Sequence, residues 1–154
     1  MRMEKPTDIL VSVDVETAGP YPGRYSLLSI GACLVSNFGA TFYLELQPLS
    51  MDVIADALAV SGLSMEGLLE RGTPPPVAML RFAEWLQSVI PDGAHPVFVG
   101  FNAPFDWMFV NEYFHRFLGY NPFGHNALDI KAFYAGRTGA AWSETSLRHL
   151  AARY

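Results

Sequence analysis

The chain has 154 residues, 51% of them hydrophobic and 16% charged, so it can bury one sizeable core and has little room for a second. Its net charge of −5 at pH 7 argues against a protein that coats duplex nucleic acid, because that affinity comes mainly from lysine and arginine at phosphates. The single cysteine, Cys33, excludes an internal disulfide and any zinc site built from several cysteines.

Three strands are predicted in the first third of the chain. Residues 8–16 alternate valine with polar residues, and apolar runs follow at residues 25–36 and 41–47. The polar segment 37–40 predicts the turn between the second and third strands. Successive strands joined by short turns favour an antiparallel meander. Residues 51–72, which three glycines interrupt, predict one or two short helices.

The rest of the chain alternates helices with strands. Prolines at 74–76 open a helix whose apolar residues recur at helical spacing, and residues 95–101 predict a fourth strand. Residues 105–118 are apolar almost all round, which predicts a deeply buried helix. Residues 127–133 predict a fifth strand or a strand-to-helix step, and residues 144–153 a last helix. This order is typical of a mixed sheet covered by helices.

No targeting or membrane signal is found along the chain. The N-terminal residues MRMEKPTD are polar and lead directly into a predicted strand, and no apolar stretch reaches transmembrane length. We therefore expect a protein without a signal peptide or membrane span, located in the cytoplasm.

Two carboxylates occur at the end of the first predicted strand. Because positions i and i+2 of a strand face the same side, Asp14 and Glu16 present their carboxylates together, beside the turn at residues 17–19. Two like charges this close favour a shared cation, and hard oxygen ligands select Mg²⁺ or Mn²⁺ over zinc. An Asp-x-Glu triplet also occurs by chance at solvated strand ends, so the assignment needs a second element.

The second element is Asp106, in the first turn of the helix that follows the fourth strand. A carboxylate there can simply complement the positive end of the helix dipole, which is worth about 0.3–1 kcal/mol. Alternatively, Asp106 points across the end of the sheet toward Asp14 and completes a site of three carboxylates. If the fourth strand lies parallel beside the first, both carboxylates sit at the same sheet edge, where sites of α/β proteins usually form.

Two motifs together resemble a known superfamily. Asp14-Val15-Glu16-Thr17-Ala18-Gly19 resembles the first exonuclease motif of the DEDD superfamily, and Asn102-Ala103-Pro104-Phe105-Asp106 resembles the second, about 90 residues further on. The first motif and the residues from Phe105 onward are similar to the ribonuclease T branch. The resemblance implies a ribonuclease-H-like α/β fold, in which a mixed five-stranded sheet, an antiparallel three-stranded meander plus parallel strands, is flanked by helices.

The resemblance also implies an activity and a cofactor. A DEDD enzyme is a 3′-to-5′ exonuclease that hydrolyses the terminal phosphodiester of single-stranded RNA or DNA with two divalent ions, Mg²⁺ or Mn²⁺. Asp14, Glu16 and Asp106 map onto three of the four acidic metal ligands of the family. The similarity to ribonuclease T suggests a homodimer.

Four further residues are candidates for contact with the substrate. By resemblance, the backbone of Thr17 and Ala18 touches the terminal nucleotide. Asn102 either hydrogen-bonds the scissile end or caps the helix that follows it. Phe105 either stacks on a base, a contact worth roughly 1–3 kcal/mol, or packs in the core.

The last motif of the family is not found in these 154 residues. It supplies the fourth acid and the general base, and its histidine version reads His-x-x-x-x-Asp, whereas five residues after His149 stands Tyr154. Residues 145–150 instead resemble the helix that precedes this motif. We therefore expect residues 1–154 to form a single exonuclease domain that lacks its C-terminal helix and third motif. Asp129 is expected to support a turn or a neighbouring ligand rather than replace the missing acid.

Two other functions remain open at this point. A catalytically silent nucleic-acid-binding or scaffold domain of the same fold would also lack the third motif. A ribonuclease-H-type endonuclease uses a similar sheet and carboxylates, but it would not explain the block from Asn102 to Asp106.

Overall fold

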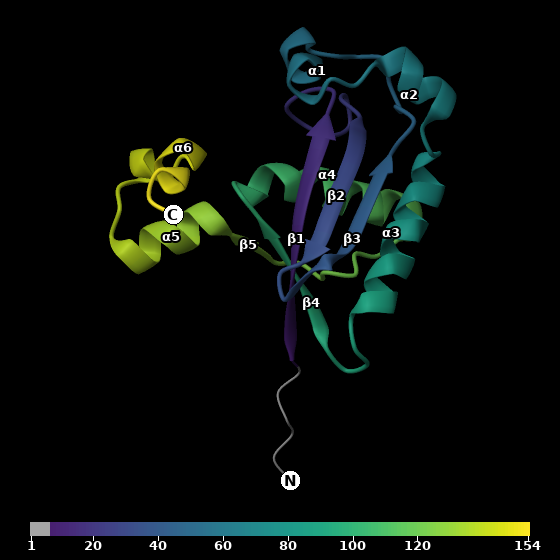
Figure 1. Cartoon of the computed structure of the whole chain (residues 1–154). Coiled ribbons are helices and arrows are strands. Elements are labelled where there is room, and N and C mark those ends of the chain that lie inside the picture. Colours follow the sequence, from purple (N-terminus) through teal and green to yellow (C-terminus); the bar gives the residue numbers. More distant parts are fainter. Residues whose placement is uncertain (1–6) are drawn as a thin grey trace.

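A five-stranded sheet runs through the centre of the molecule (Figure 1). The computed structural model describes residues 7–154, so most of the polar N-terminus discussed above lies outside the described residues. The strands follow the order β3-β2-β1-β4-β5, with β1 antiparallel to β2, β2 antiparallel to β3, and β4 parallel to both β1 and β5. The predicted mixed sheet is therefore confirmed. The strands are β1 (Asp8–Thr17), β2 (Leu27–Leu34), β3 (Asn37–Glu45), β4 (His95–Gly100) and β5 (Ala127–Asp129).

The helices lie in three places around this sheet. Helices α3 and α4 pack against each other and against the sheet, while α1 and α2 lie beyond the C-terminal end of β1 and α5 and α6 extend from β5 (Figure 1). No helix in the described part of the chain is long and apolar enough to cross a membrane. The helices are α1 (Ala55–Ser61), α2 (Met65–Arg71), α3 (Pro75–Val89), α4 (Ala103–Leu118), α5 (Ile130–Thr138) and α6 (Leu147–Ala151), with a 3₁₀ turn η1 (Trp142–Glu144) before α6.

The core lies between the sheet and helices α3 and α4. Val11, Val13 and Val15 of β1 are all buried, and with a period of two they point to the same face of the sheet. On that face Phe82 of α3 stacks on Phe114 of α4, with ring centroids 5.5 Å apart. Because successive side chains of a strand alternate, the even-numbered residues of β1 point away from this core.

The hairpin between β2 and β3 turns earlier than the sequence predicted. Val35 and Ser36 form the turn, and Asn37 already pairs with Leu34, so the prediction of a turn at residues 37–40 is wrong. The side chain of Asn37 accepts a hydrogen bond from the N–H of Gly39 at 3.1 Å, and these polar residues form an irregularity within β3. Register follows from which face of each strand is buried, and here it outweighs the local turn signal.

Asp129 joins β5 to two helices at once. Its Oδ1 accepts a hydrogen bond from the N–H of Ala103 at 3.0 Å, at the start of α4, and its Oδ2 accepts one from the N–H of Ala132 at 3.1 Å, at the start of α5. Both N–H groups belong to the first turns of helices, which lack partners inside the helix. Asp129 therefore has a supporting role, as predicted, and fixes where α4 begins.

Replacing Asp129 tests this double cap. We expect Asp129→Ala to lower the free energy of unfolding by about 1–4 kcal/mol, since each lost cap costs roughly 0.5–2 kcal/mol. Asp129→Asn keeps one oxygen acceptor and should lose less. Urea unfolding provides the measurement, with Asp92→Ala in an exposed loop as the control. Equal stability of Asp129→Ala and Asp92→Ala would contradict the assignment.

Candidate active site

Strand β1 loses its parallel neighbour before it ends. Its pairing with β4 stops at Ser12 and Val99, whereas its pairing with β2 continues to Thr17. Strand β4 ends at Gly100 because the chain turns there into α4. The last residues of β1 therefore have no strand to pair with on the side of β4. The buried N–H of Val15 needs a hydrogen-bond acceptor from elsewhere in the chain.

Asp106 supplies that partner from the first turn of α4. Its Oδ1 accepts a hydrogen bond from the N–H of Val15 at 3.0 Å, and Asp106 as a residue is only 4% exposed. Val15 lies between Asp14 and Glu16 in the strand. The contact therefore brings a third carboxylate to the strand end that carries the other two.

The three carboxylates repel one another. Burial raises the pKa of Asp14, and burial together with the charge of Asp14 raises the pKa of Glu16. Burial raises the pKa of Asp106 to about 7, with smaller contributions from the charges of Asp14 and Glu16, although the hydrogen bond from Val15 acts in the opposite direction. Such mutual effects require that the groups lie close together.

This donor set has the chemistry that a hard divalent cation prefers. The ion pairs found in residues 7–154 are Arg24–Asp52 and Arg116–Glu112, and neither neutralises the three carboxylates. As they stand, no three histidine, cysteine or acidic side chains in the described residues are gathered tightly enough to form a metal site. The oxygen ligands and their uncompensated charge suit Mg²⁺ or Mn²⁺, and the assignment of the three residues as ligands stays a prediction.

Two cavities adjoin the end of β1. The first, of about 310 Å³, opens beside the carboxylates and receives side chains from β2, β3 and the end of α1. The second, of about 250 Å³, lies between the loop after β1 and helices α1 and α4. Residues of the first include Asp14, Glu16, Ser29, Tyr43, Ser61 and Leu63, and those of the second are Thr17, Gly19, Pro20, Ile54, Ala57 and Phe105.

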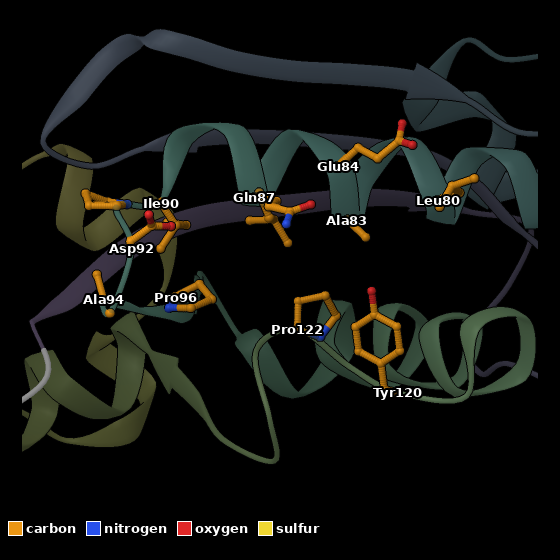
Figure 2. A pocket seen from close by; sticks show the side chains of 13 residues that line it. Leu80, Ala83, Glu84, Gln87, Ile90, Asp92, Ala94, Pro96, Tyr120 and Pro122 are labelled. Carbon is orange, nitrogen blue, oxygen red and sulfur yellow. The ribbon is translucent and has the colours of Figure 1, made fainter.

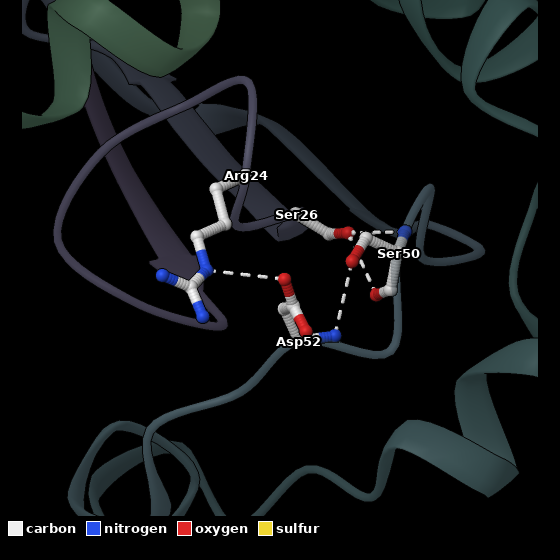
Figure 3. Close-up of polar contacts among 4 residues, drawn as sticks. All are labelled: Arg24, Ser26, Ser50 and Asp52. Carbon is white, nitrogen blue, oxygen red and sulfur yellow. Dashed lines mark hydrogen bonds and ion pairs between the residues drawn. The ribbon is translucent and has the colours of Figure 1, made fainter.

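Hydrogen bonds tie together the two loops that border the second cavity. Figure 3 shows the hydroxyl of Ser26, which accepts from the N–H of Ser50 at 3.0 Å and donates to the carbonyl of Ser50 at 3.2 Å. The same hydroxyl also accepts from the N–H of Leu49 at 2.9 Å. Nearby, Nε of Arg24 donates to Asp52 Oδ2 at 3.1 Å. The segment that leads into α1 is thereby held against the loop that follows β1.

The four residues predicted to contact the substrate differ in whether their groups are free to contact a nucleotide. Thr17 and Phe105 line the second cavity. Ala18 is fully buried; its N–H donates to the carbonyl of Ser26 at 2.9 Å and its carbonyl accepts from Ile54 at 2.8 Å. The N–H of Ala18 is therefore already used within the chain and is not free for a nucleotide.

Asn102 does not cap α4. It is the one residue other than glycine with a positive φ in residues 7–154, with φ 61° and ψ 45°, and its side chain makes no capping hydrogen bond. The capping alternative is wrong because Asp129 takes that role. The exposed amide of Asn102 remains available at the start of α4, in a strained backbone conformation of the kind that is common at functional sites.

Tyr43 was missed by the sequence analysis. It lies on β3, exposed, in the same cavity as Asp14 and Glu16. Only the pairing across three strands places it there, since it lies opposite Gly31, which lies opposite Asp14. The misplaced turn at residues 37–40 hid this register.

A further cavity, of about 510 Å³, lies elsewhere on the molecule. Figure 2 shows it between helix α3, with Glu84 and Gln87, and the segment that follows α4, with Tyr120 and Pro122. None of the predicted site residues lines it. It therefore has no part in the site at the end of β1.

Comparison with known proteins shows to which family the chain belongs. No family model matches it. It is 51% identical, over 151 residues, to a protein of Escherichia coli named 3′-5′ DNA exonuclease Cap18, an alignment that covers 98% of this chain and 80% of the relative. The chain belongs to the DEDD-type 3′-to-5′ exonucleases. The narrower resemblance of this exonuclease to ribonuclease T stays a prediction.

Solved exonuclease I structures share its fold. An exonuclease I from Methylocaldum szegediense superposes with a TM-score of 0.63 at 21% identity, over 84% of this chain and 29% of that one. The E. coli exonuclease I in complex with a dT13 oligonucleotide gives a TM-score of 0.61 at 16% identity, over 84% and 30%. The chain thus spans less than a third of the length of these proteins, and the likeness confirms the predicted ribonuclease-H-like fold.

The raised pKa of Asp106 predicts how the stability of the metal-free protein depends on pH. The folded state holds this proton up to a pH of about 7, whereas the unfolded chain releases it near 3.8. The folded state therefore binds more protons in this interval, and the free energy of unfolding falls as pH rises from about 4 to about 7, by a few kcal/mol at most.

Asp106→Asn isolates this effect, because it keeps an oxygen acceptor for Val15 but has no proton to lose. We expect the variant to show a shallower decrease than the unaltered protein when urea unfolding is followed in EDTA between about pH 4 and about pH 8. The same pH dependence in both proteins would show that Asp106 titrates at its ordinary value.

Proposed function

We propose that this exonuclease removes nucleotides from the 3′ end of single-stranded DNA with the help of Mg²⁺ or Mn²⁺ held by Asp14, Glu16 and Asp106. The contact between Asp106 and Val15 is the observation that carries the proposal, since it brings the carboxylate of Asp106 to the strand end that carries Asp14 and Glu16. The family supports the direction of digestion, and the name of the E. coli relative supports DNA over RNA. RNA ends, which the sequence left open, are the comparison substrate.

The acidic cluster needs cations before a phosphate can approach it. Two bound ions would activate a water molecule and stabilise charge at phosphorus and on the leaving 3′ oxygen. The contribution of the chain is to hold its carboxylates ready: β1 fixes the spacing of Asp14 and Glu16, and the hydrogen bond from Val15 fixes Asp106. The terminal nucleotide is held in the cavities beside β1, and the exposed amide of Asn102 lies at the start of α4 to meet the strand.

We propose that residues 7–154 supply neither the fourth acid nor the general base of the site. Asp129 uses one carboxylate oxygen for each of two helix caps. His149 sits in the short helix α6, where its Nδ1 contacts the hydroxyl of Ser146 at 2.6 Å. Neither residue is therefore placed to complete the site.

We further propose a cytoplasmic location, which the polar N-terminal sequence led us to expect, and a homodimer, on the resemblance to ribonuclease T alone. Sedimentation equilibrium of the purified protein at micromolar concentration tests this part. A monomer at all concentrations would remove the dimer from the proposal without affecting the site.

A nuclease assay with two lengths of protein tests the function. On a 5′-labelled single-stranded DNA oligonucleotide with Mg²⁺, we expect little product from the 154-residue chain and stepwise shortening from the 3′ end by a version that continues beyond Tyr154. Asp14→Asn in the longer version should lower the rate at least about 100-fold, because even residues that only support metal ligands cost about 10- to 100-fold.

Asp92→Asn, in an exposed loop, is the matched control and should leave the rate unchanged. Circular dichroism of both variants checks that the fold is intact. Unchanged turnover of Asp14→Asn would refute the metal role, and full activity of the 154-residue chain would mean that its own residues complete the site. Inactivity of the longer version with an intact fold would favour the catalytically silent binding domain.

A further inference from the structure

Leu27 lies at an irregular point of the sheet, where β2 pairs with the end of β1. Glu16 pairs with Ser29, but the next residue of β1, Thr17, pairs with Leu27, so β2 has one extra residue between these two pairs. A bulge of this kind disrupts the ladder of hydrogen bonds. Leu27 is fully buried, so its N–H needs an acceptor within the protein.

The hydroxyl of Tyr113, on α4, is this acceptor. Its oxygen accepts a hydrogen bond from the N–H of Leu27 at 2.9 Å, and Tyr113 is only 1% exposed. Burial raises the pKa of Tyr113 to about 12, so the hydroxyl is uncharged at neutral pH. The side chain therefore joins α4 to β2 without adding a charge to the interior.

Asp106 and Tyr113 make the same kind of contact from the same helix. Tyr113 follows Asp106 after close to two helical turns, so both side chains project from one face of α4, about 10 Å apart along its axis. Each accepts a hydrogen bond from a buried strand residue, Val15 of β1 for Asp106 and Leu27 of β2 for Tyr113. Helix α4 is thus attached to two neighbouring strands at two separate points.

The contact at Leu27 differs from the others in its place along α4. Asp129 and Val15 both hold the first turn of the helix, at Ala103 and Asp106. In the described part of the chain, the bond between Tyr113 and Leu27 is the one hydrogen bond that ties α4 to a strand beyond this first turn. It therefore fixes the far end of the helix.

The orientation of α4 determines where the carboxylate of Asp106 points. A helix that is held only in its first turn can pivot there, and apolar packing, which is not directional, opposes this motion less than a second hydrogen bond does. Metal sites tolerate little of such motion, since their ligands must be held in one orientation by further contacts of the protein. The contact at Leu27 therefore bears on the site at the end of β1.

We propose that Tyr113 is a positioning residue: its hydrogen bond to Leu27 fixes the orientation of α4 and thereby the direction of the Asp106 carboxylate. The inference rests on the proposed function, because it assigns a supporting residue to the metal ligands of that site. Tyr113 acts through Asp106 and needs no contact with the cation or the nucleotide.

Hydrogen exchange of the Val15 amide tests the positioning itself. Tyr113→Phe keeps the ring and removes only the hydroxyl. Asn111→Ala is the matched control, because it also removes one hydrogen bond of α4, from Asn121 Nδ2 at 2.9 Å, which joins the helix to the segment after it and not to a strand. In metal-free protein followed by NMR, we expect Val15 to exchange at least about tenfold faster in Tyr113→Phe than in Asn111→Ala, since its acceptor Asp106 is held less firmly.

The affinity for Mn²⁺, measured from the EPR signal of the free ion, tests the consequence for the site. We expect Tyr113→Phe to weaken binding about tenfold, as removal of a group that orients a metal ligand does, and Asn111→Ala to leave the affinity unchanged. Circular dichroism and urea unfolding check that both variants are folded and lose similar stability.

Equal exchange of Val15 in the two variants, or an unchanged Mn²⁺ affinity of Tyr113→Phe, would overturn the assignment. So would a Tyr113→Phe protein that does not fold, because the hydroxyl would then be a requirement of folding itself. If the unaltered protein binds no Mn²⁺, the proposed function fails and the inference with it, whereas Mn²⁺ binding that Tyr113→Phe leaves unaffected removes the inference alone.

Discussion

Strand β1 continues past the point where its parallel neighbour β4 turns away, and the buried N–H of Val15 must find an acceptor outside the sheet. Asp106 provides it at 3.0 Å. An unpaired buried N–H would cost about 1–3 kcal/mol, so this contact is required by folding as well as by chemistry. Asp129 fixes the start of α4 from β5, and the contact with Val15 then places the carboxylate of Asp106 at the strand end that carries Asp14 and Glu16.

The same contact that satisfies the N–H of Val15 also buries a carboxylate beside another acid, which is electrostatically unfavourable in the metal-free protein. Burying Asp106 beside Asp14 raises its pKa to about 7, so the metal-free protein holds an acid that does not ionise readily. A cation would stabilise the ionised forms of all three carboxylates and offset this cost. The unfavourable electrostatics of the metal-free site are thus the physical reason for expecting it to bind cations.

The sequence predicted those parts that depend on local patterns. Alternating valines in β1 implied that Asp14 and Glu16 share the face opposite the core, and the helix start at residues 102–106 implied a carboxylate near them. Parts that depend on pairing between distant residues were not predictable in this way. The early turn at Val35 and Ser36, and with it the place of Tyr43 opposite Gly31, follows from strand register.

Asn102 illustrates the same limit. Its position before a helix is typical of a cap, and only the three-dimensional contact of Asp129 with Ala103 shows that another residue has taken this role. The buried N–H and carbonyl of Ala18, both used by neighbouring loops, likewise depend on segments that are distant in the chain.

The central claim is that Asp106 shares one electrostatic environment with Asp14 and Glu16. An NMR titration of the Asp106 side-chain carboxyl carbon in metal-free protein tests it most directly. We predict a pKa of about 7, a lower pKa in Asp14→Asn because the neighbouring charge is removed, and a lower pKa again when Mg²⁺ is added to the unaltered protein. A pKa near the ordinary value of 3.8 in both proteins, unmoved by Mg²⁺, would contradict the account.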